Sequence, residues 1–417
     1  MKKTHIFTWV LYDFANSITL VVFNLYYSQW LVVDRGLPDF AFNMIYVASS
    51  ALLLFTAPIL GLMADRTGRR LTYLKRVTWC TYGFFGAASI LPLCGSPMSP
   101  WPLWPAVFCY LMANYTYLLS IVFYTPLLSD ISAPERRGFV SGLGLVGNWL
   151  GQVAGILACL PLLSGAPLLP GGPGRVQTFL PATLMYVALS MPMMLFFKTP
   201  HTSKPMEAGA RGGIRGFGGK CAGLLRVRGM APFLFAYFLF SDALLTISIN
   251  FPIFLNQVFR MPDRTKSLLM LMILSASAVG SAASGWLGDR YGLRRVLIGV
   301  LFAFCILLPT VATRTDAGSF TFFIVLLSAF FGAVFTVSRA LLTRLCPAER
   351  LNFASSFYVL FERLATFIGP VVWGAIVSGF FRLGPVRYRL AFGAMTVFVL
   401  AGALIALKVP KQIPPSA

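Results

Sequence analysis

Charged side chains occur inside segments that are otherwise apolar. Asp13, Asp242, Glu362 and Arg363 each interrupt a long run of hydrophobic residues. A carboxylate at the centre of a membrane-spanning helix costs about 2.5–3.5 kcal/mol on insertion scales, so it usually faces a partner or a water-filled cavity. In such a cavity it could bind a cationic group or take up and release a proton. A fixed ion pair or a hydrogen bond between helices is the alternative.

Glu362 and Arg363 are adjacent residues of opposite charge. They lie about 11 residues into the segment Leu351–Phe381, a depth of about 16 Å at the rise of an α-helix. Neighbouring residues on a helix point in different directions, so one of the two could pair with Arg339 or with an aspartate across the cavity while the other remains for a ligand. An amino-acid-like zwitterion needs both signs of charge. A buried structural network is the alternative interpretation.

Amide side chains accompany these charges. Asn148 and Gln152 are four residues apart and therefore share one face of a helix. Asn16 follows Asp13 by three residues. We expect these amides to contact the same solute or proton site as the carboxylates. Ordinary hydrogen bonding between helices is the alternative for each.

The elements that position these residues follow from composition. The chain has 57% hydrophobic and 11% charged residues and a mean hydropathy of +0.76, which excludes an ordinary soluble protein. Only helices and closed barrels span a bilayer, a helix needs roughly 20 apolar residues, and the runs do not alternate as barrel strands would. The expected spans are 6–33, 40–64, 77–129, 138–174, 176–197, 231–259, 267–288, 296–313, 320–338, 351–381 and 390–407.

The run Val77–Ser129 is too long for one crossing. Prolines between Pro92 and Pro105 interrupt it, so we expect it to fold back as two helices. The sequence therefore predicts an all-α membrane protein with twelve transmembrane helices.

Basic residues account for the net charge of +21, and most fall in alternate loops between the expected helices. This pattern is typical of membrane topology rather than nucleic-acid binding, and it places both termini in the cytoplasm at the plasma (inner) membrane. The heaviest cluster lies in a Gly-rich stretch. We therefore expect a six-helix bundle at 1–197, a basic cytoplasmic linker at 198–229 and a second six-helix bundle at 230–417.

The second half of the sequence is an internal repeat of the first. A Gly-x-x-x-Asp-Arg-x-Gly turn follows the second expected helix, and a copy follows the eighth. Asp13 matches Asp242 in position, and Asn148 matches Glu362. Two parallel repeats of six helices are a transporter architecture, with the substrate near the membrane midplane. The turn residues are Gly61, Asp65, Arg66, Gly68 and Arg70 in the first copy, and Gly285, Asp289, Arg290 and Gly292 in the second.

These paired turns could act as gates. Gly61 and Gly285 are small enough to let a neighbouring helix approach closely. The carboxylates of Asp65 and Asp289 could then meet an arginine or a helix N-terminus and hold the cytoplasmic side shut, with Arg339 on the same side. The arginines of the turns could instead serve only as topology signals.

The paired turns resemble the signature of the major facilitator superfamily. More narrowly, the stretches LYDFANS (Leu11–Ser17), APERRGFVSGLG (133–144), FLFAYFLFSDALLTI (Phe233–Ile247) and SRALLTRLCPAER (Ser338–Arg350) resemble the autophagy-linked vacuolar effluxer branch. The resemblance runs from the first to the twelfth expected helix. It implies two pseudo-symmetric bundles in the major facilitator fold, gating turns at Asp65 and Asp289, and amino-acid efflux.

The sequence thus predicts a secondary transporter that moves a small polar metabolite, most often an amino acid, by alternating access. We expect a monomer in contact with membrane lipid, a small-molecule substrate, and a proton or the solute gradient as the driving force. No cofactor or metal is expected, because the seven cysteines form no CxxC pair and the two histidines lie outside the helices.

Two alternatives remain. An exporter of drugs or lipids would have the same fold, with a cavity dominated by Phe and Met. An integral membrane enzyme is disfavoured, because a catalytic histidine, a metal cluster or a large domain outside the membrane would be needed.

Overall fold

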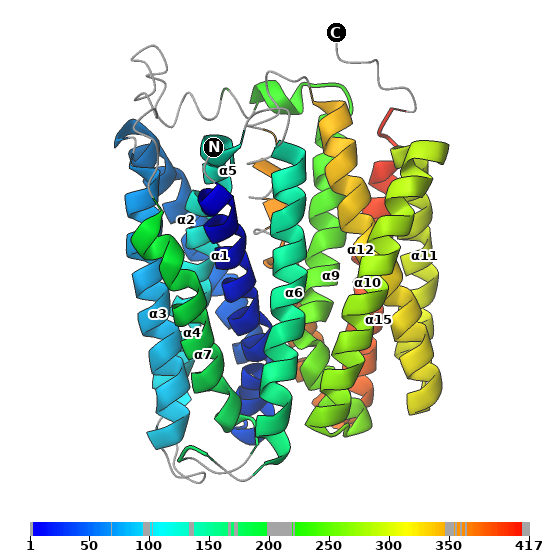
Figure 1. Ribbon diagram of the computed structural model, residues 1–417. Coiled ribbons are helices and arrows are strands. Elements are labelled where there is room, and N and C mark those ends of the chain that lie inside the picture. The colour runs from blue at the N-terminus through cyan, green and yellow to red at the C-terminus, as the bar shows by residue number, and fades with distance from the viewer. Residues whose placement is uncertain are drawn as a thin grey trace. The chain divides into compact units, whose positions relative to one another are not determined.

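The computed structural model is built from α-helices, with no strand among the residues that it describes (Figure 1). This confirms the all-α prediction. The structure describes residues 3–67, 69–94, 101, 103–132, 137–165, 168–170, 174–197, 219, 222–346, 354, 357–358, 361–362 and 365–410.

Six long helices come from the first half of the sequence. The first of them continues beyond α1 as two π-helical turns, at Phe23–Tyr27 and Trp30–Asp34. The expected proline-interrupted run does form two helices, α3 and α4. The six are α1 (Lys3–Val22), α2 (Asp39–Thr67), α3 (Arg70–Cys94), α4 (Leu103–Tyr124), α6 (Arg137–Ser164) and α7 (Val176–Phe196).

The second half supplies the remaining helices. Within the described residues, eleven helices of the chain are long and apolar enough to cross a membrane, and α14 is a shorter apolar helix. The chain is therefore an integral membrane protein. The helices of the second half are α9 (Met230–Phe259), α10 (Asp263–Tyr291), α11 (Leu293–Thr313), α12 (Ala317–Leu345), α14 (Ile368–Gly379) and α15 (Val386–Ala406).

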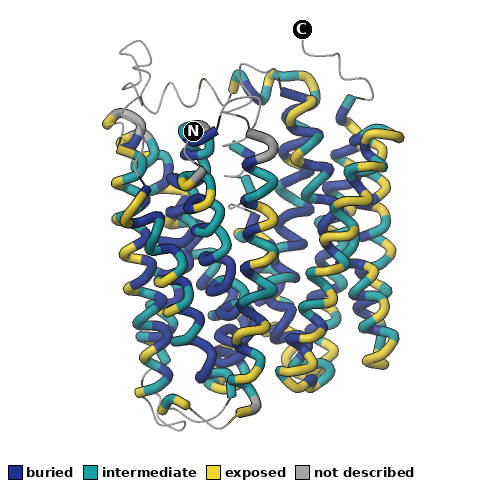
Figure 2. The backbone as a smooth tube through the Cα atoms, in the orientation of Figure 1, coloured by how far each residue is buried: buried dark blue, intermediate teal, exposed yellow. Residues whose placement is uncertain are grey.

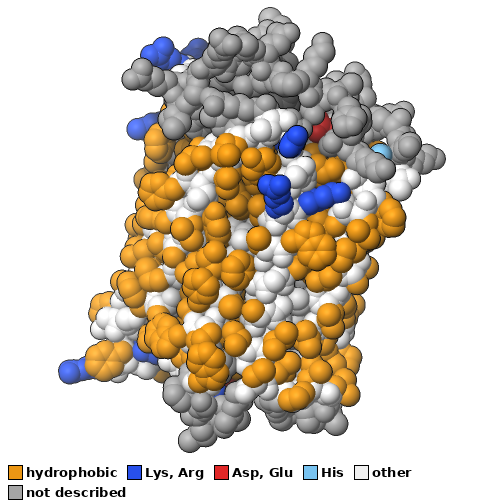
Figure 3. Space-filling view, turned by 90° about the vertical axis from the view of Figure 1, so that its left-hand side faces the viewer, with side chains coloured by type: hydrophobic (Ala, Val, Ile, Leu, Met, Phe, Trp, Pro, Cys, Tyr) orange, Lys and Arg blue, Asp and Glu red, His pale blue; other side chains and the backbone are white. Residues whose placement is uncertain are grey.

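Large apolar side chains are exposed along the helices, as expected for surfaces that face lipid rather than water. Phe55, Trp104 and Ile306 are all more than half exposed. Each helix also has a buried face, so buried and exposed residues alternate along the backbone (Figure 2). On the face shown in Figure 3, hydrophobic side chains cover the middle, and the Lys and Arg side chains lie nearer its two ends.

The chain divides into two compact units that exchange short segments. The first unit contains residues 1–38, 48–211 and 262–267, and the second contains residues 39–47, 212–261 and 268–417. The first turns of α2 thus pack with the second unit, and the first residues of α10 pack with the first unit. Most of the expected linker at 198–229 lies outside the described residues.

In the first unit, a ridge of glycines on α6 packs against α1. A Cβ atom at Gly147 would meet Val10, and one at Gly151 would collide with the carbonyl oxygen of Phe14. At the next glycine in the ridge, Gly155, a Cβ atom would lie 3.0 Å from the carbonyl oxygen of Ile18. Small residues let two helix backbones approach, which is how membrane helices gain packing contacts without a hydrophobic driving force.

Hydrogen bonds between buried hydroxyl groups join α3 to its neighbours. Tyr12 of α1 and Thr78 of α3 share a hydrogen bond of 2.8 Å between their hydroxyl oxygens. Tyr82 and Ser190 do the same between α3 and α7, at 2.6 Å. These bonds satisfy polar groups that lipid could not solvate.

In the second unit, glycines join α10 to α12. A Cβ atom at Gly280 would collide with the backbone of Ala329, and one at Gly332 would collide with the backbone of Ser277. The Ser277 hydroxyl donates to the carbonyl oxygen of Ser328 at 2.7 Å.

The eleventh expected helix is broken, whereas the sequence predicted one crossing at Leu351–Phe381. Glu362 is helical, and the amide of Ala365 donates to the carbonyl oxygen of Phe361 at 2.9 Å. Residues 365–367 then form a turn, and α14 begins at Ile368. Pro370 explains part of the break, since proline lacks a backbone N–H and its ring clashes with the carbonyl of the residue four positions earlier, Thr366.

Candidate functional site

In the first unit, three of the predicted site residues form a chain of hydrogen bonds. Asn148 Nδ2 donates to Asp13 Oδ1 at 3.4 Å, and Gln152 Nε2 donates to Asn148 Oδ1 at 2.8 Å. All three side chains are half-buried. The predicted common face of Asn148 and Gln152 is therefore present, and α6 presents its amides to the carboxylate on α1.

Aromatic rings lie beside this chain. Trp9 and Tyr124 are stacked, with ring centroids 4.7 Å apart, and the Tyr124 hydroxyl donates to the carbonyl oxygen of Trp9 at 2.9 Å. Asp13 lies within electrostatic range of Tyr124. Asn16 is buried and interacts with Tyr12, so it faces the helix packing rather than the Asp13 chain.

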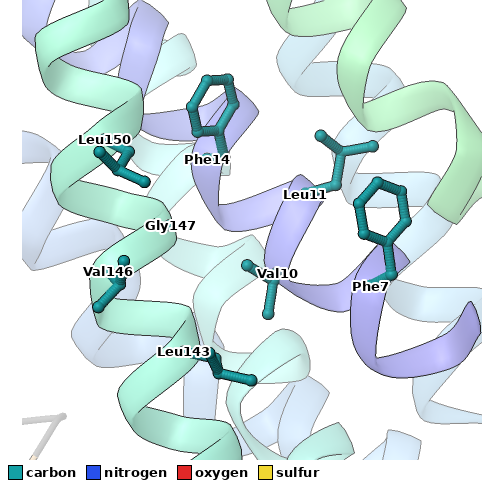
Figure 4. Close-up of a pocket in the computed structure, with 8 residues that line it drawn as sticks. All are labelled: Phe7, Val10, Leu11, Phe14, Leu143, Val146, Gly147 and Leu150. Atoms are coloured by element: carbon teal, nitrogen blue, oxygen red, sulfur yellow. The ribbon is translucent and has the colours of Figure 1, made fainter. Parts of the chain in front are cut away.

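An apolar pocket of about 230 Å³ lies between the same two helices (Figure 4). Each helix contributes four residues with the spacing of one helical face. In Figure 4 the labelled side chains of α1 and α6 border a common space, and Val10 lies beside Gly147, where a Cβ atom would collide with it. The lining residues are Phe7, Val10, Leu11, Phe14, Leu143, Val146, Gly147 and Leu150.

In the second unit, Glu362 is bound by a tyrosine. The Tyr237 hydroxyl donates to Glu362 Oε2 at 2.8 Å, and the Tyr237 ring stacks on Tyr358 at a centroid distance of 4.0 Å. Arg339 is exposed and lies within electrostatic range of Tyr358. Among the described side chains, the hydrogen bond to the Glu362 carboxylate comes from Tyr237, a partner that the sequence did not suggest. Arg363 lies outside the described residues.

Asp242 has a different environment from its repeat partner Asp13. It is fully buried, and its Oδ2 accepts a hydrogen bond from the amide of Gly369 at 2.6 Å. Asn250, which lies on the same helix, forms two hydrogen bonds with Asn43, at 2.8 and 3.0 Å. Asp242 therefore lies away from any surface that a solute could reach in this conformation.

The structure describes more residues of the second predicted gating turn than of the first. The side chains of Asp65 and Arg66, and all of Gly68, lie outside the described residues. Among described atoms, nothing comes within 4 Å of a Cβ placed at Gly61 or at Gly285, so the expected close approach of a helix is absent at both.

The second turn is open to solvent. Asp289 Oδ1 and Arg344 Nη2 are 3.4 Å apart, and the Asp289 side chain is 80% exposed. Arg290 lies over the ring of Trp286, at 5.5 Å from its centroid. Gly292 has a φ of +90° and caps the start of α11, which explains the glycine at this position. Arg70 is the first residue of α3.

An ion cluster joins the π-helical turn at Trp30–Asp34 and the first turn of α10 to Arg175, the residue before α7. Arg175 binds Asp34 at 2.6 Å and Asp263 at 2.8 Å, and Lys266 binds Asp263 at 2.7 Å and also Gln29. Burial alone would lower the pKa of the Arg175 guanidinium, but hydrogen bonding to Asp263 and the negative charges of both carboxylates raise it. Arg175 is therefore charged at physiological pH.

Sequence reasoning missed several residues of these sites. Tyr237 is an ordinary aromatic residue in an apolar run, so nothing in the sequence indicated its bond to Glu362. The ion cluster was missed because its members come from three segments that are far apart in the sequence. Gly369 and Pro370 were visible signals, since a Gly-Pro pair inside a predicted helix indicates a break. Within the described ranges, no group of three or more His, Cys, Asp or Glu residues could hold a metal ion.

Comparison with known protein sequences gives a partial family match. Residues 233–417 match the sequence model of the Major Facilitator Superfamily. The MFS-type transporter YxiO of Bacillus subtilis (strain 168) is 24% identical, with 97% of this chain and 94% of that protein covered. A multi-drug resistance efflux pump PmrA homolog of Lactococcus lactis is also 24% identical, with 97% and 94% covered.

Solved structures match the whole chain. A bacterial homolog of the human lysosomal transporter Spinster, in an inward-facing and unoccupied conformation, has a TM-score of 0.76 at 12% identity and covers 98% of each chain. A D-xylose-proton symporter has a TM-score of 0.72 at 15% identity, with 99% of this chain and 98% of that chain covered. The chain therefore has the all-α, twelve-helix fold of major facilitator transporters, and its residues 233–417 match that family in sequence as well.

Proposed function

We propose that this protein is a secondary transporter of the major facilitator superfamily that moves a small polar metabolite bearing an ammonium group, with amino acids as the leading class. It works by alternating access and exports its substrate across the plasma membrane as a monomer with cytoplasmic termini. The match at residues 233–417 and the shared fold support the family. The proposal also assigns a gating role to the two paired turns, with Asp65 in the first and Asp289 in the second.

The observation that carries the substrate class is the Asp13–Asn148–Gln152 chain. A half-buried carboxylate within α1 is too costly to leave facing lipid, so it favours a solute-accessible surface. Asn148 donates to Asp13 and Gln152 donates to Asn148, so neutral amides of α6 orient the carboxylate. A negative group held in this way would attract a cation, and the stacked rings of Trp9 and Tyr124 add electron-rich faces nearby.

The second unit supplies a matching group. Glu362 occupies the repeat position of Asn148, and Tyr237 holds it by a neutral hydrogen bond. We propose that Glu362 and Asp13 both act in translocation, and that Arg363 binds the carboxylate of a zwitterionic substrate. One of the two acidic groups would carry the coupling proton, because a carboxylate can bind either a proton or an ammonium group.

Counterflow in proteoliposomes tests this function. Vesicles that contain the purified protein and are loaded with one amino acid should accumulate the same labelled amino acid. The Asp13→Asn variant should have an affinity for that amino acid about tenfold lower, which is the loss expected when a hydrogen bond to a charged group is removed. A panel of neutral, basic and acidic amino acids and of organic acids identifies the class. Accumulation of organic acids alone would overturn the ammonium proposal.

Export of amphipathic cations is the second candidate, and the apolar pocket favours it. The pocket lies between the helices that carry Asp13 and Asn148, so a molecule with a cationic end and an apolar body could use both. The similarity to an efflux pump homolog named for multi-drug resistance is consistent with this candidate. The polar substitution Val146→Ser separates the candidates, since it should weaken export of a lipophilic dye and leave amino-acid counterflow unchanged.

A further inference from the structure

The break in the eleventh crossing is specific to the second sequence repeat. At the offset that aligns Asn148 with Glu362, the turn at residues 365–367 aligns with residues 151–153. Those residues lie in the middle of α6, which is helical from Arg137 to Ser164. The second repeat thus has a helix N-terminus where the first repeat has continuous helix.

A helix that begins inside a membrane needs partners for its first amides. Proton donors in the first turn of a helix have no acceptor within that helix, and lipid offers none. In α14, Pro370 has no N–H, and the N-cap residue Phe367 makes no side-chain capping bond. The amides of Ile368 and Gly369 therefore depend on a group from another element.

Asp242 supplies that group. Its Oδ2 accepts from the amide of Gly369 at 2.6 Å, and its carboxylate also interacts with the amides of Phe367 and Ile368. The fit is close, because a Cβ atom at Gly369 would collide with the hydroxyl of Thr246 and lie 3.0 Å from the carbonyl oxygen of Asp242. Any other residue at position 369 would push α14 away from α9.

Helix α9 also binds the segment that precedes the break. Tyr237 of α9 donates to Glu362, which precedes the turn, and Asp242 binds Gly369, which follows it. Two polar contacts from α9 therefore fix both ends of the break. The position of Glu362 relative to α14 depends on them.

We propose that Asp242 is a positioning residue that caps α14 from a neighbouring helix and so holds the break that orients Glu362. It does not contact the solute. This role replaces the sequence-based expectation that Asp242 handles substrate or protons. It rests on the proposed function in one respect, namely that Glu362 belongs to the translocation path.

The test compares removal of the cap with its replacement on α14 itself. Asp242→Ala removes the acceptor, and Phe367→Asp in the same chain places a new acceptor at the N-cap position, where a carboxylate can bind the amide of Gly369. Phe367 is 40% exposed, so the second substitution does not disturb the core. Asp242→Asn keeps an acceptor oxygen without the charge. Ser241→Ala, which deletes a buried hydroxyl on the same helix, is the matched control.

Hydrogen–deuterium exchange of the peptide spanning residues 367–373 is the first measurement, and it needs no substrate. Exchange should accelerate about tenfold in Asp242→Ala, as expected for loss of a cap, and return close to the wild-type rate in Asp242→Ala/Phe367→Asp. Ser241→Ala should exchange as the wild type does. Unchanged exchange in Asp242→Ala overturns the proposal, whatever the protein transports.

Counterflow of the solute identified above is the second measurement. Asp242→Ala should lower the maximal rate about tenfold with little change in KM, and both Asp242→Asn and the double variant should recover most of the rate. If Asn is as damaging as Ala and Phe367→Asp gives no rescue, Asp242 acts on substrate or proton and the positioning role is wrong. If Asp242→Ala does not fold, Asp242→Asn with and without Phe367→Asp gives the same comparison.

Discussion

Arg175 forms a bidentate salt bridge with Asp263, which is 88 residues later in the chain. Its Nε donates to Oδ2 at 2.8 Å and its Nη2 donates to Oδ1 at 3.1 Å. Arg175 precedes the last helix of the first repeat, and Asp263 begins the second helix of the second repeat. The bridge therefore connects the two sequence repeats within one compact unit, to which residues 262–267 belong.

Loss of this bridge should destabilise the conformation seen here. Arg175 and Asp263 side chains are 11% and 19% exposed, and breaking a largely buried pair costs about 3–5 kcal/mol because one charge remains uncompensated. Arg175→Gln should therefore lower the thermal unfolding midpoint in detergent by several degrees. The exposed Arg382 provides the control, since Arg382→Gln should leave the midpoint unchanged. The double variant Arg175→Gln/Asp263→Asn should lose less than the two single variants together.

Neutral variants of Asp13 and Glu362 test proton coupling. The carboxylate that carries the proton must change charge as the site switches sides, so its neutral variant should keep counterflow but lose accumulation driven by a pH gradient. Asp13→Asn and Glu362→Gln are measured side by side, with Asp242→Asn expected to keep its response. Full pH-driven accumulation in both test variants would exclude proton transfer through these groups and favour a uniporter or a sodium-coupled carrier.

The hydroxyl of Tyr237 should matter for substrate affinity. Tyr237→Phe removes the hydrogen bond to Glu362 and leaves the stacking on Tyr358, so KM for counterflow should rise about tenfold, as for loss of a hydrogen bond to a charged group. Tyr82→Phe removes a buried hydrogen bond of similar length to Ser190 and should change thermal stability only. Equal KM values in both variants would show that Glu362 does not bind the substrate.

The glycine ridge should be intolerant of a single methyl group. A Cβ atom at Gly151 would collide with the carbonyl oxygen of Phe14, so Gly151→Ala must push α1 and α6 apart, at a cost of about 1–3 kcal/mol. Gly142 lies on the same helix with nothing within 4 Å of its Cβ position among the described atoms. Gly142→Ala should therefore be neutral or slightly stabilising. A lower thermal midpoint in both variants would point to helix flexibility rather than packing.

Substitution of Asp289 distinguishes a role in gating from a role in stability. Its side chain is 80% exposed and 3.4 Å from Arg344, and an exposed pair contributes about 0–1 kcal/mol. Asp289→Asn should leave the thermal midpoint unchanged while slowing counterflow, because the proposed gate closes in another conformation. Asp65→Asn should behave in the same way. Unchanged turnover in both variants would indicate that the paired turns act only as topology signals.

Much of the fold could be predicted from the sequence because the bilayer imposes a length and a polarity on each helix. Every crossing must satisfy its backbone within itself and present about 20 apolar residues, so the long apolar runs locate most of the helices. The repeat of the Asp65 turn at Asp289 predicts, in addition, a division into two halves. The shared face of Asn148 and Gln152 followed from their spacing of four residues.

Tertiary structure decided what each polar group contacts. Asp13 and Asp242 have the same residue type and matching positions in the two repeats, yet one accepts from an amide side chain and the other from the backbone of Gly369. The difference arises because α6 continues where the eleventh crossing breaks. A carboxylate next to continuous helix can bind only side chains, whereas one next to a helix N-terminus meets free amides. Sequence spacing determines which residues share a helix face, but only the packing of α9 against α14 brings residues 127 positions apart into hydrogen-bonding distance.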